Sequence, residues 1–526
     1  MNENQKYGFD VWGFLHLPGV LDGDEIASCA KALSSGSADA CRVLRDHTTL
    51  TDCLETILGD DYSLDAAPAL AGPVDVSAGV RLDAGDPERN RRLRYIRRPN
   101  NPVCHGLRVC WVLAASPEDR LVVVPASHKR LFDPPADLLN GVDDMGMTVE
   151  LAPEAGDLVI LAATTICGVG ARSGVWRLAE SGYVSQRMMP SEGYPTKPVP
   201  DWAAGLTPEQ QAIIGPRTTG IGGGLTSDGV HTRLVGALEE TPQAAFTLPG
   251  GAAPDPKEVF YWDVRGYLPL RNIMDGEWLA AAHRAIDAMI EVQPQLPDGH
   301  LSKFEEVAEA ILRDNGGVWP EETSVRLRGE IHRPRLGGLY ELEKPHCQPF
   351  HRMIGYPPIV QRLNWMLGYG FRESTEPMCC VYPAGTTGGS LHGQNPGGYA
   401  FVNGRQLVEQ VNVAWALHDE APGFGADSGG FLCVPGSHKA AYTIPRSLTT
   451  SIDLPQVYKP PLQAGDVLMF GAVAHGTTAW RSKRQRRTVI QFMGSGNVAL
   501  APGKKSVGWR WSTDLNNPAN KAAAKS

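Results

Sequence analysis

The sequence predicts a mainly β protein with flanking helices (α+β), built as two similar units. Three motifs support this prediction, because each occurs twice and the copies keep the same order along the chain. The motif pairs are residues 13–26 and 266–279, residues 124–129 and 434–439, and residues 155–161 and 464–470. Self-similarity of this kind indicates a tandem duplication of one β-rich unit, and two copies are too few for a solenoid. We therefore expect two domains.

The predicted domains are residues 1–190 and residues 256–505, a division that suits a chain of 526 residues. Residues 191–255 between them are rich in proline, glycine and threonine, which is typical of a linker or an irregular segment. Residues 506–526 end in an alanine- and lysine-rich stretch, so we expect a flexible tail there.

Each unit is expected to begin with a short strand, a turn and a helix. In the first unit Asp22 or Asp24 is suited to cap this helix, and apolar residues follow at helical spacing. In the second unit the helix is expected to continue to about Val292. Further predicted helices lie near residues 303–315 and 358–367, and further predicted strands are residues 411–417, 467–473 and 488–493.

The composition indicates a soluble, intracellular protein. A formal net charge of -9 argues against general binding to nucleic acid or to anionic membranes, and the basic run 481–487 is better explained as a turn before a buried strand. Ten cysteines without a Cys-x-x-Cys pair predict reduced thiols and a cytoplasmic location. The first residues lack the features of a signal peptide, and no stretch approaches the roughly 20 apolar residues that span a bilayer.

A Pro-x-Ser-His-Lys loop occurs in both units and contains His128 and His438. In the first unit this loop is present although the other candidate metal ligands are not. We therefore expect both histidines to have a structural role in the turn rather than to bind metal.

Two other histidines suggest a mononuclear iron site in the second unit. His392 precedes a predicted strand, His475 follows the strand at 467–473, and Arg486 lies on the next strand. Iron sites of this kind use two histidines and a carboxylate on one face of the metal and leave the other positions open. An arginine that points into the same interior would bind a carboxylate bidentately. Arg487 is the alternative, because a shift of one residue in the register of the strand would turn Arg487 inward in place of Arg486.

Each histidine taken alone is more often an ordinary core or surface residue, so the prediction depends on the whole arrangement. In the first unit Cys167 is the counterpart of His475 if one residue of slippage is allowed, and Arg177 stands about where Arg486 does. Residues 86–90, where a counterpart of His392 would be sought, contain no histidine. The first unit is therefore predicted to lack a working metal site.

Taken together, these motifs resemble the phytanoyl-CoA dioxygenase family of iron(II)/2-oxoglutarate-dependent oxygenases. The resemblance implies a double-stranded β-helix (jelly-roll, cupin-like) fold for each unit. It also implies that His475 binds Fe(II), that Arg486 and Thr477 bind 2-oxoglutarate, and that the first ligand pair of the family falls on His392 and Gln394. The substrates it implies are molecular oxygen and a small organic molecule.

Gln394 stands where the family has an aspartate, and an amide is a poor ligand for iron. Three explanations remain open. A carboxylate elsewhere, such as Glu409 or Asp427, could complete the site. A halide could occupy the position, as in related halogenases that have a small residue there, although glutamine is larger. The site could also have lost its catalytic role. His346 and His351 could add ligands, but a structural role in their loop is the preferred interpretation.

The function predicted from the sequence is that of an Fe(II)/2-oxoglutarate-dependent dioxygenase of the hydroxylase type. Its chemistry is predicted to lie in the second unit, where the metal-site residues are His392, His475 and Gln394. The first unit is predicted to be a degenerate copy. One alternative is a non-catalytic binding or scaffold protein that keeps the oxygenase fold. Others are a halogenase-like enzyme, and another cupin-type metalloenzyme that works without 2-oxoglutarate.

Overall fold

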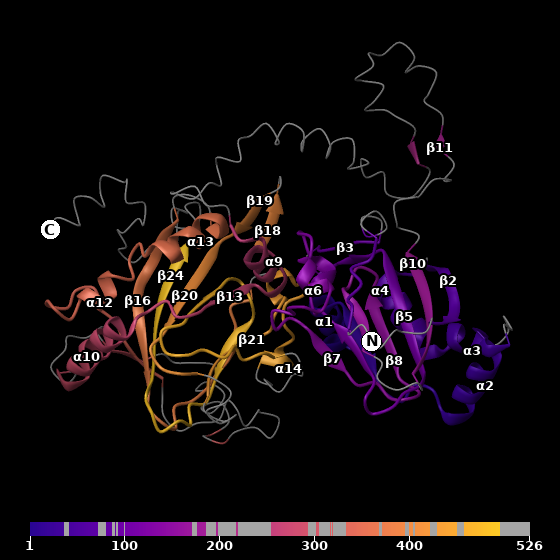
Figure 1. Cartoon of the computed structure of the whole chain (residues 1–526), viewed down its shortest axis with the longest axis horizontal. Helices are drawn as coiled ribbons and strands as arrows, with labels where there is room; N and C mark the ends of the chain where they lie inside the picture. The colour runs from indigo at the N-terminus through magenta and orange to yellow at the C-terminus, as the bar shows by residue number, and fades with distance from the viewer. Residues whose placement is uncertain are drawn as a thin grey trace, which may run out of the picture. The chain divides into compact units, whose positions relative to one another are not determined.

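A computed structural model of the chain contains two compact units, Met1–Ala245 and Phe246–Ser526 (Figure 1). The boundary between them falls inside the predicted linker. The structure describes residues 1–35, 41–60, 62–71, 80–86, 90, 93–98, 100–170, 176–185, 196–197, 217–218, 254–292, 301–303, 316, 318, 333–367, 371–394, 399–402, 405–420, 429–449 and 457–494. Most of the predicted linker, most of the predicted helix at 303–315, and the predicted tail lie outside these residues.

The first unit contains short helices and two main antiparallel sheets. Its elements are α1 (Glu3–Trp12), β1 (Phe14–Leu17), α2 (Gly23–Ser34), α3 (Cys41–Asp46), α4 (Thr48–Leu58), β2 (Tyr62–Leu70), β3 (Tyr95–Ile96), β4 (Val103–Cys104), β5 (Gly106–Ala114), β6 (Arg120–Val123), the 3-10 helix η3 (Ser127–Lys129), α6 (Ala136–Leu139), β7 (Val149–Leu151), β8 (Leu158–Ala162), β9 (Cys167–Gly170), β10 (Arg177–Ser185), β11 (Thr196–Lys197) and β12 (Arg217–Thr218).

The second unit follows the same plan. Its elements are α9 (Pro256–Arg265), β13 (Tyr267–Leu270), α10 (Gly276–Val292), β14 (Leu301–Lys303), β15 (Pro334–Leu336), α12 (Gln348–His351), α13 (Pro357–Leu367), β16 (Arg372–Tyr382), β17 (Gly389–His392), β18 (Tyr399–Val402), β19 (Arg405–Val408), β20 (Gln410–Ala416), β21 (Gly430–Cys433), the 3-10 helix η8 (Ser437–Lys439), α14 (Arg446–Thr449), β22 (Val467–Phe470), β23 (His475–Thr478) and β24 (Arg486–Gly494).

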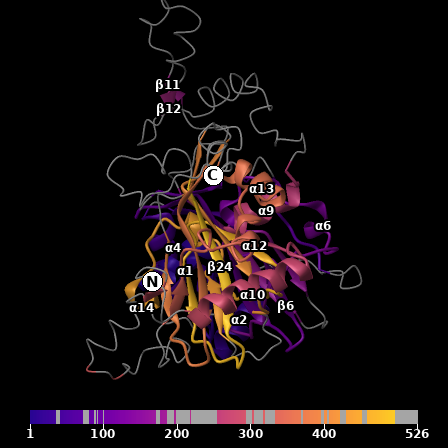
Figure 2. The same cartoon turned by 90° about the vertical axis from the view of Figure 1, so that its left-hand side faces the viewer.

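The large sheets of the two units have the same core order. In the first unit it is β1-β8-β5-β10-β2, and in the second it is β13-β22-β20-β24-β16, extended by β15 and β14. Each unit adds a three-stranded sheet, β7-β6-β9 or β17-β23-β21. In the second unit α10 and α12 cover one face of the large sheet (Figure 2), and the Trp278 ring of α10 lies 5.5 Å from the Trp415 ring of β20. Buried Val413 and Trp415 anchor β20 in this core.

The helix boundaries follow from local capping. Asp22 caps α2 and forms a capping box with Glu25, which confirms one of the two predicted caps. The sequence interpretation missed the helices that precede the two repeated glycines. Helix α1 begins at a capping box of Asn2 and Gln5, α9 begins with Asp255 before a proline, and both end at a left-handed glycine, Gly13 or Gly266.

The predicted strand at 467–473 is shorter than expected, because β22 ends at Phe470. The chain turns at residues 471–474, which places His475 at the start of a strand in the smaller sheet. The predicted helix at 358–367 and the predicted strands at 411–417 and 488–493 correspond to α13, β20 and β24. None of the helices within the described residues is long and apolar enough to cross a membrane.

A buried aspartate in each unit joins the first helix to the Pro-x-Ser-His-Lys loop. In the second unit Asp263 Oδ1 accepts hydrogen bonds from Lys439 Nζ at 2.5 Å and Tyr399 OH at 2.8 Å, and the Asp263 carbonyl accepts from His438 Nε2 at 3.0 Å. In the first unit Asp10 makes the same contacts. Its partners are Lys129 at 2.7 Å, Tyr95 at 2.9 Å and His128 at 3.0 Å. The predicted structural role of both loop histidines is confirmed.

Candidate metal centre

His392 and His475 lie side by side on neighbouring antiparallel strands. They are register partners between β17 and β23, and their ring centroids are 4.5 Å apart. The next residue, Gly393, has a φ of +78°, and a Cβ atom there would lie 2.3 Å from Cε1 of His475. Only glycine fits this backbone conformation and this close approach. The structure therefore brings together the two histidines that the sequence singled out.

Main-chain carbonyl groups fix the tautomer of both rings. The Nδ1 atom of His392 lies 2.8 Å from the Ser390 carbonyl oxygen, and Nδ1 of His475 lies 2.9 Å from the Val473 carbonyl oxygen. A carbonyl oxygen only accepts, so each Nδ1 carries the hydrogen and each Nε2 carries the lone pair. Histidines that bind metals are oriented in the same way.

The surroundings of the two rings favour the neutral form that a metal ligand requires. Desolvation, and after it the neighbouring His392, lower the pKa of His475 to about 3. Desolvation also lowers the pKa of His392, with smaller contributions from the charges of Arg333 and Arg335. Phe470 contacts the His475 ring edge-on at a centroid distance of 4.8 Å and contributes to this apolar environment.

A cavity in the second unit is lined by both histidines, and its described wall combines apolar side chains with three arginines. The arginines are Arg333, Arg335 and Arg486. Thr477, Thr488, Tyr382 and Asn412 add polar groups, and the apolar residues include Phe431, Leu468, Phe470, Ile490 and Phe492. A mostly apolar pocket with a few convergent polar groups is typical of a site for a small molecule.

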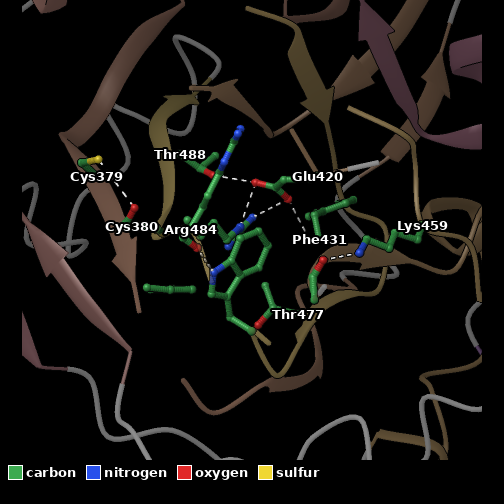
Figure 3. Close-up of polar contacts among 12 residues, drawn as sticks. Cys379, Cys380, Glu420, Phe431, Lys459, Thr477, Arg484 and Thr488 are labelled. Atoms are coloured by element: carbon green, nitrogen blue, oxygen red, sulfur yellow. Dashed lines mark hydrogen bonds and ion pairs between the residues drawn. The ribbon is translucent and has the colours of Figure 1, made fainter. Parts of the chain in front are cut away.

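Arg486 points into the interior, as predicted, but its fork already holds a carboxylate of the chain. Its Nε and NH2 atoms donate to Glu420 Oε1 and Oε2 at 2.8 and 3.1 Å. Glu420 also accepts from Thr488 Oγ1 at 2.7 Å and from the Phe431 main-chain N–H at 3.2 Å (Figure 3). Both side chains are buried. Burial would raise the pKa of Glu420, but Arg486 and these donors together lower it, so the carboxylate is ionised.

Thr477 is held by a second arginine. Its Oγ1 accepts from Arg333 NH1 at 2.6 Å and from the Gly389 main-chain N–H at 3.0 Å. Arg487, the alternative to Arg486, points away from the cavity and donates to Asp287 and His283 of α10. The sequence interpretation missed both Glu420 and Arg333. Glu420 lies beyond the end of β20 at Ala416, outside any strand pattern, and the Arg-Pro-Arg motif at residues 333–335 was the one available signal for Arg333.

The Gln394 side chain makes hydrogen bonds to the main chain of a neighbouring loop. Its Nε2 atom donates to the Tyr442 carbonyl at 2.8 Å, and its Oε1 atom accepts from the Ile444 N–H at 2.9 Å. Within the described residues, no group of three or more His, Cys, Asp or Glu side chains is placed to hold a metal ion. Glu409 is exposed, and Asp427 lies outside the described residues. His392 and His475 are therefore the two side chains here that suit a metal.

His346 and His351 lie elsewhere in the second unit. His346 lines a separate hollow beside α10 and α12, and His351 Nε2 bonds to the Tyr340 carbonyl at 2.8 Å. Neither lines the cavity of His392 and His475. The contact of His351 agrees with the structural role preferred for it, and the role of His346 stays a prediction.

The first unit has different residues at the corresponding positions. Asp83 pairs with Cys167 where His392 pairs with His475, so the counterpart of His392 is Asp83 rather than a residue in 86–90. Cys167 is the counterpart of His475, as predicted. The register also aligns Arg177 with Arg487 instead of Arg486, and the Arg177 side chain is exposed.

Residues 262–488 match the family model of phytanoyl-CoA dioxygenase (PhyH). This stretch contains His392, Gln394, His475, Thr477 and Arg486. The match supports an oxygenase or a related enzyme role for this part of the chain, and residues 1–261 lie outside it. No curated protein sequence matches the chain.

Solved structures that resemble the chain do so at low identity. HygX from Streptomyces hygroscopicus, crystallised with nickel and 2-oxoglutarate, is 16% identical with a TM-score of 0.34, over 46% of this chain and 88% of HygX. EctD from S. alaskensis, with 2-oxoglutarate and 5-hydroxyectoine, is 12% identical with a TM-score of 0.34, over 46% of this chain and 76% of EctD. The epimerase SnoN from nogalamycin biosynthesis is 14% identical with a TM-score of 0.31, over 45% of this chain and 81% of SnoN. At TM-scores below 0.5 these likenesses carry no inference about the chemistry of this chain.

Proposed function

We propose that the second unit is an Fe(II)/2-oxoglutarate-dependent oxygenase of the hydroxylase type that acts on a small organic substrate. The main support is the pairing of His392 with His475. Their ring centroids lie 4.5 Å apart, and the Nδ1 of each ring is bound to a carbonyl oxygen, which leaves an unprotonated Nε2 on each. The match of residues 262–488 to the phytanoyl-CoA dioxygenase family supports the same assignment.

The residues of the cavity have distinct roles in this proposal. His392 and His475 would hold Fe(II), which together with 2-oxoglutarate supplies an oxidant for an unactivated C–H bond. Phe431 and Phe470 pack around the His475 ring and keep water away from it. Arg333 and Arg335 of the wall provide the positive charge that attracts a dicarboxylate, whereas the charge of Arg486 is balanced by Glu420. Thr477 provides a hydroxyl group beside them.

The contacts of Gln394 favour a second candidate, a halogenase-like enzyme. The size of the glutamine side chain argued against a halide at this position. In the structure, however, that side chain bonds to the main chain at Tyr442 and Ile444, so its amide is engaged away from the two imidazoles. Two protein ligands then leave a further position for a chloride or bromide ion. The two candidates share every other residue of the site.

We propose that the first unit is a degenerate copy produced by tandem duplication, and that each unit has a jelly-roll core within residues 1–190 and 256–505. The shared sheet order and the paired contacts of Asp10 and Asp263 support this proposal. Nine of the ten cysteines are buried free thiols, which supports a reducing compartment such as the cytoplasm.

Anaerobic titration of the apoprotein with Fe(II) and then 2-oxoglutarate tests the proposed function. We expect a visible charge-transfer band in the wild type and no band in His475→Ala. Succinate should form from 2-oxoglutarate once oxygen is admitted, and halide-dependent turnover would favour the second candidate. Iron binding without a band would indicate a metalloenzyme that does not use 2-oxoglutarate. A wild type that binds no iron would reject both candidates and favour a scaffold protein.

A further inference from the structure

The ion pair of Arg486 and Glu420 occupies the fork that the family resemblance assigns to 2-oxoglutarate. The Glu420 carboxylate binds bidentately to the Nε and Nη2 edge of Arg486. Both side chains are almost completely buried, at 4% and 1% exposure. A ligand that displaced Glu420 would leave a buried carboxylate without its counter-charge, which is strongly unfavourable. Arg486 is thus committed to a partner inside the protein.

Arg333 lies on the cavity wall beside Thr477, where the chain makes room for it. The Arg333 side chain is buried and donates to Thr477 Oγ1 at 2.6 Å. Gly389, the register partner of Thr477, faces the Arg333 guanidinium group so closely that a Cβ atom would lie 2.3 Å from NH1. Glycine at this position therefore permits the guanidinium group to reach Thr477.

The charge of the cavity suits an acidic ligand. Its described wall has three arginines and no aspartate or glutamate, and Glu420 outside the wall balances Arg486. Burial and the nearby charges of Arg335 and Arg486 lower the pKa of Arg333 to about 10, so it is still charged at neutral pH. Thr477 Oγ1 accepts two hydrogen bonds, which leaves its own hydrogen to donate.

We propose that Arg333, together with the Thr477 hydroxyl, binds the carboxylate of 2-oxoglutarate that lies away from the metal, and that Arg486 serves as the internal partner of Glu420. This inference rests on the proposed function, because it needs a dicarboxylate at the two-histidine site. It transfers to Arg333 the anchoring role that the sequence resemblance gave to Arg486. Thr477 keeps the role predicted for it.

Ligand binding to metal-loaded protein tests this assignment without turnover. Isothermal titration calorimetry under anaerobic conditions would compare 2-oxoglutarate with 2-oxobutyrate, which lacks the distal carboxylate. In the wild type we expect 2-oxoglutarate to bind at least 30-fold more tightly. Arg333→Met should abolish this preference while the metal stoichiometry and the melting temperature stay the same, and Arg333→Lys should restore part of it.

The matched control is the double variant Glu420→Leu/Arg486→Met, which replaces the buried ion pair by apolar side chains and can therefore keep the fold. We expect it to retain the preference for 2-oxoglutarate within threefold of the wild type. Arg333→Met is decisive by itself if the double variant does not fold, because a preference that persists in Arg333→Met overturns the inference. Loss of the preference in a folded, metal-bound double variant overturns it as well.

The same titrations separate this inference from the proposed function. A wild type that binds neither metal nor 2-oxoglutarate overturns both. A wild type that binds metal and prefers 2-oxoglutarate, with a preference that survives in Arg333→Met, overturns the assignment to Arg333 alone.

Discussion

The two units share a structural frame but differ in the residues that this frame presents. In both, a fully buried aspartate binds the lysine of the Pro-x-Ser-His-Lys loop, a tyrosine hydroxyl and the loop histidine. Where the second unit pairs two histidines across antiparallel strands, the first pairs Asp83 with Cys167. The frame therefore belongs to the fold, and the pair of histidines is a separate feature that the second unit has and the first lacks.

The interiors of the units also differ in where they place charge. In the first unit Arg108 NH1 lies 3.2 Å from the Cys167 sulfur, and Arg108 NH2 donates to Glu180 at 2.9 Å. A guanidinium group thus occupies the space beside the counterpart of His475, where it would repel a metal cation. In the second unit, the position aligned with Arg108 is Asn412, and the interior ion pair is made by Glu420 and Arg486.

The largest effect is expected from breaking the shared frame. Asp263→Ala would leave Lys439 buried without its partner and should lower the free energy of unfolding of the second unit by about 3–5 kcal/mol. Asp10→Ala should do the same to the first unit through Lys129. Calorimetric unfolding of the full chain would measure both. Tyr399→Phe is the control, since it removes one hydrogen bond and should cost about 1–2 kcal/mol. A change below about 1 kcal/mol in either alanine variant would show that the frame is not what stabilises the units.

The next effect concerns the acid stability of the second unit. Arg486 and the neighbouring donors hold the pKa of Glu420 below its usual value, so the unfolded chain binds a proton more readily than the folded one. The stability from this carboxylate is present above the unfolded pKa and is lost as the pH falls through the folded pKa. Glu420→Gln should therefore lower the free energy of unfolding by about 3 kcal/mol at neutral pH. It should also reduce the slope of this free energy against pH in the acid range by up to about 1.4 kcal/mol per pH unit.

Urea denaturation between neutral and acid pH would measure this difference. Glu180→Gln is the control in the first unit, because the Glu180 side chain is 27% exposed and its ion pair with Arg108 is screened by solvent. If the free energy of unfolding falls equally steeply with acid pH in the wild type and in Glu420→Gln, the contribution assigned to Glu420 is contradicted.

The two units are also expected to differ in metal binding. We expect one Fe(II) per chain, and a loss of affinity of at least about 100-fold in His392→Ala and His475→Ala, because each removes a direct ligand. Asp83→Ala and Cys167→Ala should leave the stoichiometry at one. Elemental analysis after anaerobic loading and desalting would measure these values. Two metals per chain, or metal lost from a first-unit variant, would contradict the division between the units.

Repetition within the sequence was sufficient to predict much of the fold. The repeated glycine, loop and Ala-Gly-Asp motifs located β1 and β13, the loops of His128 and His438, and strands β8 and β22. These motifs mark tight turns and caps, which depend on few residues that are close in sequence. The sequence also singled out His392 and His475, from their places beside predicted strands and the arginine that follows, and the structure pairs the two on adjacent strands.

The partners of Arg486 and Thr477 could not be predicted in the same way. Glu420 meets Arg486 across 66 positions of sequence, and Arg333 meets Thr477 across 144. Side-chain pairs of this kind are set by the tertiary arrangement of strands, and no local pattern encodes them. The position of a counterpart to His392 was also misjudged by a few residues, because a single β-bridge at Asp83 carries no periodic signal.

The smallest effect we predict comes from the glycine that follows His392. In the first unit the residue after Asp83 is Ala84, and Cys167 stands where the second unit has the His475 imidazole. In the second unit Gly393 has a φ of +78°, and an added Cβ atom would lie 2.3 Å from the His475 ring. Gly393→Ala should therefore tilt His475 away from its position and weaken Fe(II) binding by about 10-fold, a typical cost of disturbing the orientation of a ligand.

Anaerobic competition with a metal-binding dye would measure this change, with Ala84→Gly as the matched variant in the first unit. Ala84→Gly should leave metal affinity unchanged, because nothing at that position has to make room for a ligand. Unchanged affinity in Gly393→Ala would mean that the imidazole position tolerates a shifted strand. In that case the difference between the units would lie in the histidines alone, and the backbone that supports them would not contribute to it.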